Sequence, residues 1–203
     1  MKRTLLLFLF IITATMVGIA QNAAKAKSIL DKTAAIVGRK GGASASFTLS
    51  GQPYGKVNGT LAVKGNMFRA VTPPTTVWYN GKTQWSYMKQ TNEVSISNPT
   101  EAQQAQMNPY KFLSLYKTGY TLGLTDKGNV WQIHLTAQNN KRSVPELYVY
   151  VNKRTYQPTQ IKMRQSKGWI TISISNFKAK NQPNSTFVFN KKYYPSAEII
   201  DLR

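Results

Sequence analysis

The feature that most constrains this 203-residue chain is an alternation of apolar and polar side chains that recurs from position 47 onward. Ile133 and Leu135, for example, flank the polar His134. Successive side chains of a strand point to opposite faces of a sheet, so each such stretch predicts a strand with one buried face. Turn residues separate the stretches, and the Asn-Gly pair at positions 80–81 is a strong hairpin signal. About ten or eleven strands without a strand–helix–strand rhythm predict an antiparallel sheet.

Two stretches break this alternation. Residues 22–37 carry apolar side chains at helical spacing, with Asn22 as a cap and Gly38 at the end. Residues 99–117 contain Asn108 and Pro109, which favour the start of a second, shorter helix. Because a sheet of ten or more strands curls on itself, we predict an incomplete antiparallel β-barrel. The two helices would form a lid or plug over a hydrophobic cavity.

The first twenty residues are typical of a signal peptide. Lys2 and Arg3 precede a short apolar run, and Gly18 and Ala20 supply the small residues of a cleavage site. We therefore expect residues 1–20 to be removed and residues 21–203 to form one domain. The chain contains no cysteine, so neither disulfides nor an N-terminal lipidated cysteine are expected. The interpretation is a freely diffusing, monomeric protein of the periplasm.

The charge is strongly positive. Lysine and arginine number 27 against seven acidic residues, for a formal net charge of +20. Such a surface attracts polyanions. Export and the lack of a clustered basic stripe argue against nucleic acid and favour acidic membrane surfaces or acidic partner proteins. A general role of the charge in solubility is the alternative, and composition alone leaves both open.

The residues offer little for catalysis. His134 is the single histidine, and its place between Ile133 and Leu135 points it away from the core. The seven acidic residues are scattered, and the glycines fit no phosphate-binding loop. The expectation is a protein that is not an enzyme, with no catalytic residue, metal site or cofactor. The aromatic residues concentrated between positions 78 and 116 fit either a packed core or a binding site.

Several segments, in order along the chain, resemble the outer-membrane lipoprotein carrier (LolA) family. The segment 59–69, which runs from Gly59 to Arg69, is similar to a strand pair of that family, and 77–87 to its Gly-Lys hairpin. The segment 108–113 is similar to the plug helix, and 187–203 to the C-terminal end. The resemblance covers essentially the whole chain after the leader.

This resemblance implies an incomplete β-barrel with a helical lid and a cavity that shelters acyl chains. By resemblance, the lid would include Phe112, Leu113 and Leu115, and Lys64 and Arg69 would be the basic candidates for a role in transfer. The cavity wall would consist of nine apolar residues: Phe47, Leu49, Leu61, Val63, Phe68, Val77, Trp85, Tyr87 and Ile96.

The resemblance also implies a function. The protein would carry lipoproteins from a releasing transporter in the inner membrane to an acceptor at the outer membrane. The chain departs from the family at one place, because Gly65-Asn66 stands where the best-known members have Arg-Pro after the lysine. A lysine does not replace the planar donor fork of arginine. Two alternatives stay open: a lipid-binding or sensing module of the same fold without transfer, and a cationic structural protein of the envelope.

Overall fold

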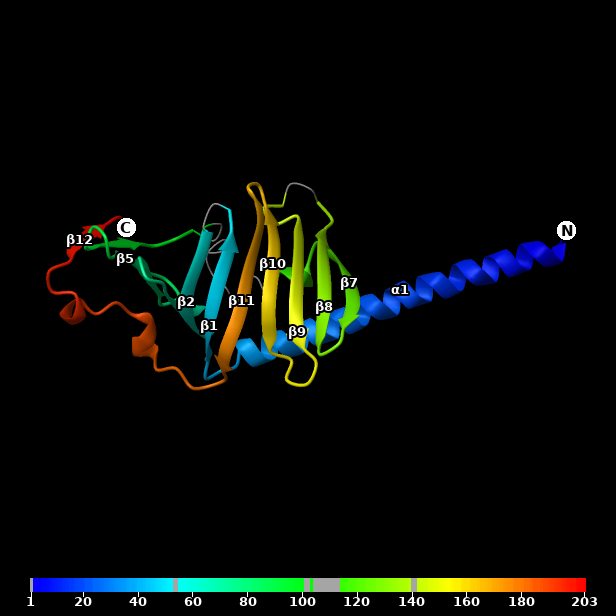
Figure 1. The fold of residues 1–203 in the computed structure, drawn as a ribbon, viewed down its shortest axis with the longest axis horizontal. Helices are drawn as coiled ribbons and strands as arrows, with labels where there is room; N and C mark the ends of the chain where they lie inside the picture. Colours follow the sequence, from blue (N-terminus) through cyan, green and yellow to red (C-terminus); the bar gives the residue numbers. More distant parts are fainter. Residues whose placement is uncertain (1, 53–54, 101–102, 104–113, 140–141) are drawn as a thin grey trace.

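The computed structural model describes residues 2–52, 55–100, 103, 114–139 and 142–203 (Figure 1). One long helix, α1, precedes a large sheet, and three short 3-10 turns lie outside both. The helix is α1 (Lys2–Val37), and the 3-10 turns are η1 (Leu115–Lys117), η2 (Asn184–Phe187) and η3 (Lys191–Tyr193). The strands are β1 (Ala43–Gly51), β2 (Gly55–Lys64), β3 (Met67–Val71), β4 (Thr75–Tyr79), β5 (Gln84–Met88), β6 (Glu93–Ser97), β7 (Tyr120–Lys127), β8 (Val130–Ala137), β9 (Glu146–Asn152), β10 (Pro158–Gln165), β11 (Gly168–Lys178) and β12 (Glu198–Asp201).

Twelve strands of the described chain form one sheet in the order β12-β6-β5-β4-β3-β2-β1-β11-β10-β9-β8-β7. The chain runs outward from β1 to β6, begins again at the far edge with β7, and returns to place β11 beside β1 (Figure 1). The prediction of a mainly β, open and curved antiparallel sheet is confirmed. The described sheet has twelve strands rather than the ten or eleven expected, and the C-terminal strand pairs with β6 in parallel.

Helix α1 covers one face of the sheet, which we call the inner face. Ala26, Ile29 and Leu30 are buried against apolar side chains of β7 to β10. The helix ends as predicted, with the amide of Gly38 donating to the carbonyl of Ala34 at 2.7 Å. Its start was predicted wrongly, since α1 begins at Lys2 rather than at residue 22. No proline precedes position 22, so nothing in the leader stops the helix.

The inner face carries two buried clusters. The first lies under α1 and includes Ile133, Leu147 and Val149. The second lies at the end of α1 and consists of Val37, Ala43, Val63, Phe68 and Tyr79. The helix thus covers the inner face on β7 to β10 and touches β1 to β4 only at its last turn. Among the described residues, no helix is long and apolar enough to cross a membrane.

The opposite, outer face is polar over β1 and β2, where Ser46, Thr48 and Thr60 project. Over β3 to β5 it is covered by the segment 179–197 that leads to β12. Trp78 on β4 has the rings of Phe189 and Tyr194 within 5.5 and 5.7 Å between centroids. Phe187 of this segment is fully buried. The C-terminal segment therefore acts as a second packing layer on the outer face.

Candidate functional site

The candidate site is the part of the inner face that the helix leaves uncovered. Four apolar residues there are only half-buried: Phe47 and Leu49 on β1, and Ile172 and Ile174 on β11. Phe47 lies directly opposite Ile174 across the strand pair, and Leu49 opposite Ile172. Directly opposed residues have their side chains on the same face. The two strands therefore present a continuous apolar surface.

This surface continues across β2 to β4. Leu61 on β2 lies opposite Ala45 and Ala70, and Ala70 lies opposite Val77 on β4. All four of these side chains are half-buried. Two alanines thus alternate with two larger residues along the row. We refer to the half-buried set as the apolar band: Ala45, Phe47, Leu49, Leu61, Ala70, Val77, Ile172 and Ile174.

The apolar band lies between the two buried clusters. Leu49, Ile172 and Ile174 pack against the edge of the first cluster, and Leu61 and Val77 against the edge of the second. Contiguous exposed apolar surface of this kind usually marks an interaction site. Its chemistry suits a hydrocarbon ligand, since the band supplies dispersion and hydrophobic contacts and no ionisable side chain.

Six of the nine predicted wall residues lie on the inner face. Val63 and Phe68 are 5% and 4% exposed and belong to the second cluster. The other four are half-buried members of the apolar band: Phe47, Leu49, Leu61 and Val77. The structure also places Ile172 and Ile174 in the band. Their alternation was visible in the sequence, but their pairing with β1 was not.

The remaining three, Trp85, Tyr87 and Ile96, lie on the outer face. Trp85 is directly opposite Trp78, whereas Val77 is opposite Ser86. A shift of one residue moves a whole strand's side chains to the other face. The register of the hairpin between β4 and β5 thus separates the aromatic residues of β5 from Val77. Ile96 on β6 is the direct partner of Trp85 and therefore lies on the same outer face.

These outer-face aromatics pack under the C-terminal segment. The ring of Tyr87 lies 4.6 Å from that of Tyr194, and its hydroxyl donates to Asn92 at 3.2 Å. Asn92 in turn donates to the carbonyl of Ser196 at 2.9 Å. The aromatic residues of β4 and β5 thus hold the C-terminal segment on the sheet.

Of the predicted lid, Phe112 and Leu113 lie outside the described residues. Leu115 lies in η1, half-buried against the first cluster. Its neighbour Tyr116 donates a hydrogen bond of 2.6 Å to Asp31 on α1. This bond, followed by one from Lys27, lowers the pKa of the Asp31 carboxyl. The turn before β7 is therefore attached to the helix.

Both predicted basic residues lie on the outer face. Lys64 donates to the carbonyl of Gln182 at 3.0 Å and to the side chain of Asn184 at 2.8 Å. Arg69 places its guanidinium 5.7 Å from the ring centroid of Trp78. Lys64 therefore ties the C-terminal segment to β2.

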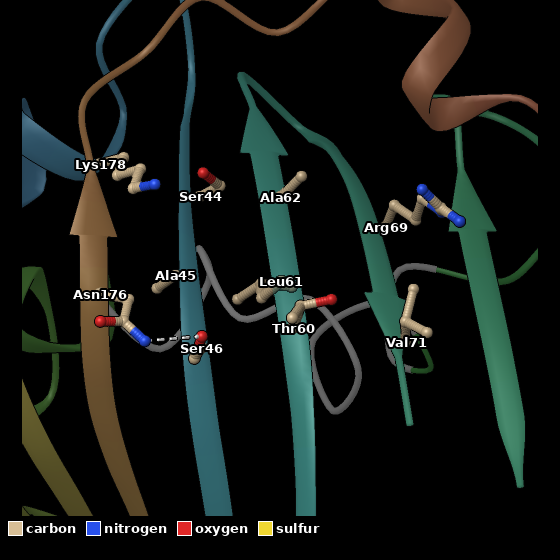
Figure 2. Close-up of a pocket in the computed structure, with 10 residues that line it drawn as sticks. All are labelled: Ser44, Ala45, Ser46, Thr60, Leu61, Ala62, Arg69, Val71, Asn176 and Lys178. Atoms are coloured by element: carbon tan, nitrogen blue, oxygen red, sulfur yellow. Dashed lines mark hydrogen bonds between the residues drawn. The ribbon is translucent and has the colours of Figure 1, made fainter. Parts of the chain in front are cut away.

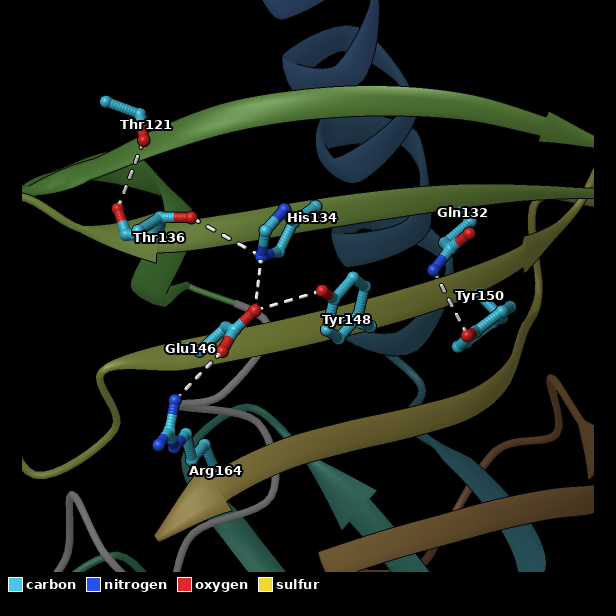
Figure 3. A network of polar contacts seen from close by, with 8 residues as sticks. All are labelled: Thr121, Gln132, His134, Thr136, Glu146, Tyr148, Tyr150 and Arg164. Atoms are coloured by element: carbon cyan, nitrogen blue, oxygen red, sulfur yellow. Dashed lines mark hydrogen bonds and ion pairs between the residues drawn. The ribbon is translucent and has the colours of Figure 1, made fainter. Parts of the chain in front are cut away.

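The outer face of β8 to β10 carries a polar network around Glu146 (Figure 3). His134 lies 2.9 Å from Glu146 and stacks on Tyr148, with ring centroids 4.3 Å apart. The Tyr148 hydroxyl donates to the same carboxylate oxygen at 2.9 Å, and Arg164 lies 3.7 Å from the other oxygen. The prediction that His134 points away from the core is confirmed. Its acidic neighbour comes from the next strand and was missed.

The network shifts two pKa values. Burial raises the pKa of Glu146, but hydrogen bonds from Tyr148 and His134 outweigh it and leave that pKa below its ordinary value. The bond to Glu146 raises the pKa of Tyr148. This carboxylate contacts His134, Tyr148 and Arg164, an arrangement that suits a structural role. No group of three or more potential metal ligands occurs in the described part of the chain.

Residues 16–167 match the model of one protein family, described as outer membrane lipoprotein carrier protein LolA. The match spans more than half of the chain. The chain belongs to this family. A comparison with curated proteins finds no match. The resemblance noted in the sequence is therefore confirmed at the level of the family.

Several solved structures align with this chain, and the first of them shows a shared fold. An uncharacterized conserved protein from Thermus thermophilus aligns with a TM-score of 0.59 at 15% identity, over 87% of this chain and 99% of that one. A putative outer membrane lipoprotein-sorting protein domain from Vibrio parahaemolyticus aligns at 0.45 and 13% identity, over 85% and 99%. The Pseudomonas aeruginosa MucA/MucB complex aligns at 0.45 and 13% identity, over 81% of this chain and 61% of that one. At these identities the likeness concerns the fold.

Membership in the LolA-like family indicates lipoprotein or lipid binding and a carrier-like role. The family is one of carriers and binding proteins rather than enzymes. The apolar band is the part of this chain whose chemistry fits such a ligand.

Proposed function

We propose that this protein is a periplasmic carrier that shelters the acyl chains of lipoproteins on the apolar band and moves lipoproteins from the inner to the outer membrane. The observation that carries the proposal is the band itself, which leaves Phe47, Leu49, Leu61 and Val77 only half-buried beside two buried clusters. Each methylene buried there contributes ~0.8 kcal/mol. A hydrocarbon chain bound on the band would complete the burial of both clusters.

The proposed setting follows from the leader and the charge. Residues 1–20 act as a signal peptide, and the mature chain is a monomer that diffuses between membranes. Its net positive charge favours encounters with acidic membrane surfaces, an effect that weakens with salt. A lipoprotein-releasing transporter would load it, and an outer-membrane acceptor would receive the cargo. The mass of the exported chain tests cleavage after Ala20.

The test of the ligand site is uptake of a triacylated peptide by the purified mature chain. Leu49→Glu and Ile172→Glu place a charge in the apolar band and are expected to abolish uptake. Thr48→Glu and Ser173→Glu put the same charge one residue away, on the outer face of the same strands. These two controls are expected to bind normally. Equal loss in both pairs, with folding intact by circular dichroism, would contradict the proposal.

A second candidate is a lipid-binding or sensing module of the same fold that does not transfer its ligand. It is favoured by Gly65-Asn66 in place of Arg-Pro, and by Lys64, whose ammonium is engaged with Gln182 and Asn184. The two candidates differ in a transfer assay between inner- and outer-membrane vesicles. Delivery of a bound lipopeptide supports the carrier, and retention supports the module.

A further inference from the structure

The outer face holds a hollow that the acyl-chain proposal does not use. It has a volume of about 340 Å³ and lies over β11, β1, β2 and β3 (Figure 2). Its lining combines small hydroxyl-bearing side chains with two cations and contains no acidic residue. The residues that line it are Ser44, Ala45, Ser46, Thr60, Leu61, Ala62, Arg69, Val71, Asn176 and Lys178.

The register arranges the two cations at the ends of one row. Lys178 lies opposite Ser44, Ser44 opposite Ala62, and Ala62 opposite Arg69. Strands are ~4.8 Å apart, so three spacings separate the Cα atoms of Lys178 and Arg69 by roughly 14 Å. Two small side chains lie between two long ones, and Figure 2 shows the cations on either side of them. The row therefore has a cationic residue at each end, and the Arg69 guanidinium extends toward Trp78 on β4.

Hydroxyl and amide groups line the neighbouring row. Ser46 lies opposite Thr60, and a break in the register between Ser44 and Ser46 places Asn176 beside them. Asn176 has a positive φ of 51° and donates to the Ser46 hydroxyl oxygen at 3.3 Å. The Ser46 oxygen accepts this bond, so its own hydrogen can be donated to a ligand. The β-bulge thus turns one more polar side chain to the outer face.

Neither cation of this hollow is neutralised by an acidic side chain of the described chain. The ion pairs among the described residues involve neither Arg69 nor Lys178. The Nε atom of Arg69 is buried without a hydrogen-bond partner in the described part of the structure. An unsatisfied buried donor is costly. Lys64, one row further along β2, is by contrast already bonded to the C-terminal segment.

We propose that this hollow binds a phosphate group carried by a small alcohol, with Arg69 and Lys178 pairing its charge and the Ser44, Ser46 and Thr60 hydroxyls donating to its oxygens. Phosphate oxygens take charge-assisted hydrogen bonds from arginine and lysine, and hydroxyls extend the set. A second hollow of about 490 Å³ shares Ser46, Thr60 and Val71 and provides room for the alcohol. Ala45 and Leu61 of the apolar band also line this hollow, and Phe47 lines the second one. The hydroxyl and cationic side chains project from the opposite face, so phosphate binding does not require acyl-chain binding.

The first experiment titrates the mature chain with glycerol 3-phosphate in physiological salt, followed by heteronuclear NMR. We expect saturable shifts at Ser44, Ser46, Thr60 and the Arg69 side chain. The double variant Arg69→Gln/Lys178→Gln is expected to weaken binding at least about tenfold. The matched control Lys82→Gln/Lys167→Gln removes the same charge at exposed sites outside the hollow and is expected to keep wild-type affinity. Equal weakening in both pairs, or shifts that never saturate, overturns the proposal.

The hydroxyl groups are tested without a change of charge. Ser46→Ala/Thr60→Val is expected to weaken glycerol 3-phosphate binding several-fold, whereas Thr171→Val/Ser173→Ala, on the same face outside both hollows, is expected to have no effect. Unchanged binding in the first pair would leave only diffuse electrostatic attraction and overturns the proposal. Variants that lose their wild-type NMR dispersion are replaced by the corresponding single substitutions.

Vesicles distinguish the source of the phosphate group. Phosphatidylcholine vesicles with added phosphatidylglycerol are offered to the same variants. If vesicle binding follows the pattern of the soluble ester, the site takes a lipid head group. If only glycerol 3-phosphate follows that pattern, the site takes a free phosphate ester. Uptake of the triacylated peptide, measured in parallel, is expected to be normal in Arg69→Gln/Lys178→Gln, so the two sites succeed or fail separately.

Discussion

The ring of Phe47 lies against the backbone of Gly59, its direct partner on β2. A methyl group at Gly59 would lie 2.5 Å from Cζ of Phe47 and 2.5 Å from the carbonyl oxygen of Val71. The glycine therefore makes room for the largest side chain of the apolar band. It also lets β2 and β3 pass close to each other.

Gly59→Ala is expected to destabilise the protein by about 1–3 kcal/mol, because it overpacks Phe47 and the carbonyl of Val71. Gly123→Ala on β7 is the matched control, since its added methyl would meet only the Cβ of His134 at 3.7 Å. Urea denaturation of both variants measures the difference. Equal midpoints for the two would contradict the packing described at Phe47.

Tyr79→Phe is expected to leave stability unchanged or raise it by about 1 kcal/mol. The Tyr79 hydroxyl is buried and has no hydrogen-bond partner in the described structure, and burial raises its pKa. Removing an unsatisfied buried group removes its desolvation cost. Tyr120→Phe is the control, because that hydroxyl donates to the carbonyl of Val144 at 2.7 Å. It is expected to lose about 1 kcal/mol. Thermal unfolding that ranks the two variants in the reverse order would refute this assignment.

The lowered pKa of Glu146 predicts that the folded protein loses stability in acid. Its pKa in the folded protein lies below the ordinary value of 4.5. A lowered carboxyl pKa contributes stability that is present above pH 4.5 and disappears as the pH falls through the folded pKa. Glu146→Gln is therefore expected to be less stable at neutral pH and to lose less stability on acidification. Unfolding midpoints measured from pH 7 to pH 3 test this.

The tyrosines supply the control for this network. Tyr148→Phe removes a donor to Glu146 and is expected to reduce the acid-dependent loss. Tyr150→Phe removes a hydroxyl on the same strand that is bonded to Gln132 instead, and is expected to keep the wild-type pH profile. An identical pH profile for both tyrosine variants would show that the bond to Glu146 has no such effect.

Tyr194→Ala is expected to loosen the C-terminal segment without affecting the apolar band. Its ring packs on Trp78, Tyr87 and Phe189 of the outer face. Tyr194 is half-buried, so its loss is expected to cost less than the roughly 3–5 kcal/mol of a fully buried aromatic side chain. Hydrogen exchange is expected to rise in β12 and in β5 to β6, while uptake of the triacylated peptide persists. Loss of uptake with unchanged exchange would contradict the placement of this cluster on the outer face.

Alternation along a strand predicted most strands and, within each strand, which residues share a face. It did not predict how faces continue from one strand to the next, because that depends on the number of residues in each turn. Tyr79 pairs with Gln84, and this register alone puts Trp85 on the face opposite to Val77. Pairings between distant segments were equally invisible, as for Phe47 with Ile174 and for the terminal strand with β6. The contact between His134 and Glu146 was missed for the same reason.

The most direct test of the apolar band uses the absence of cysteine from the chain. Single variants Leu49→Cys and Thr48→Cys are labelled with an environment-sensitive fluorophore, which places one probe on the inner face and one on the outer face of the same strand. Addition of a triacylated peptide is expected to shift the emission of the Leu49→Cys probe to the blue and to leave the Thr48→Cys probe unchanged. A shift at Thr48→Cys alone, or at neither position although the peptide binds, would contradict the account.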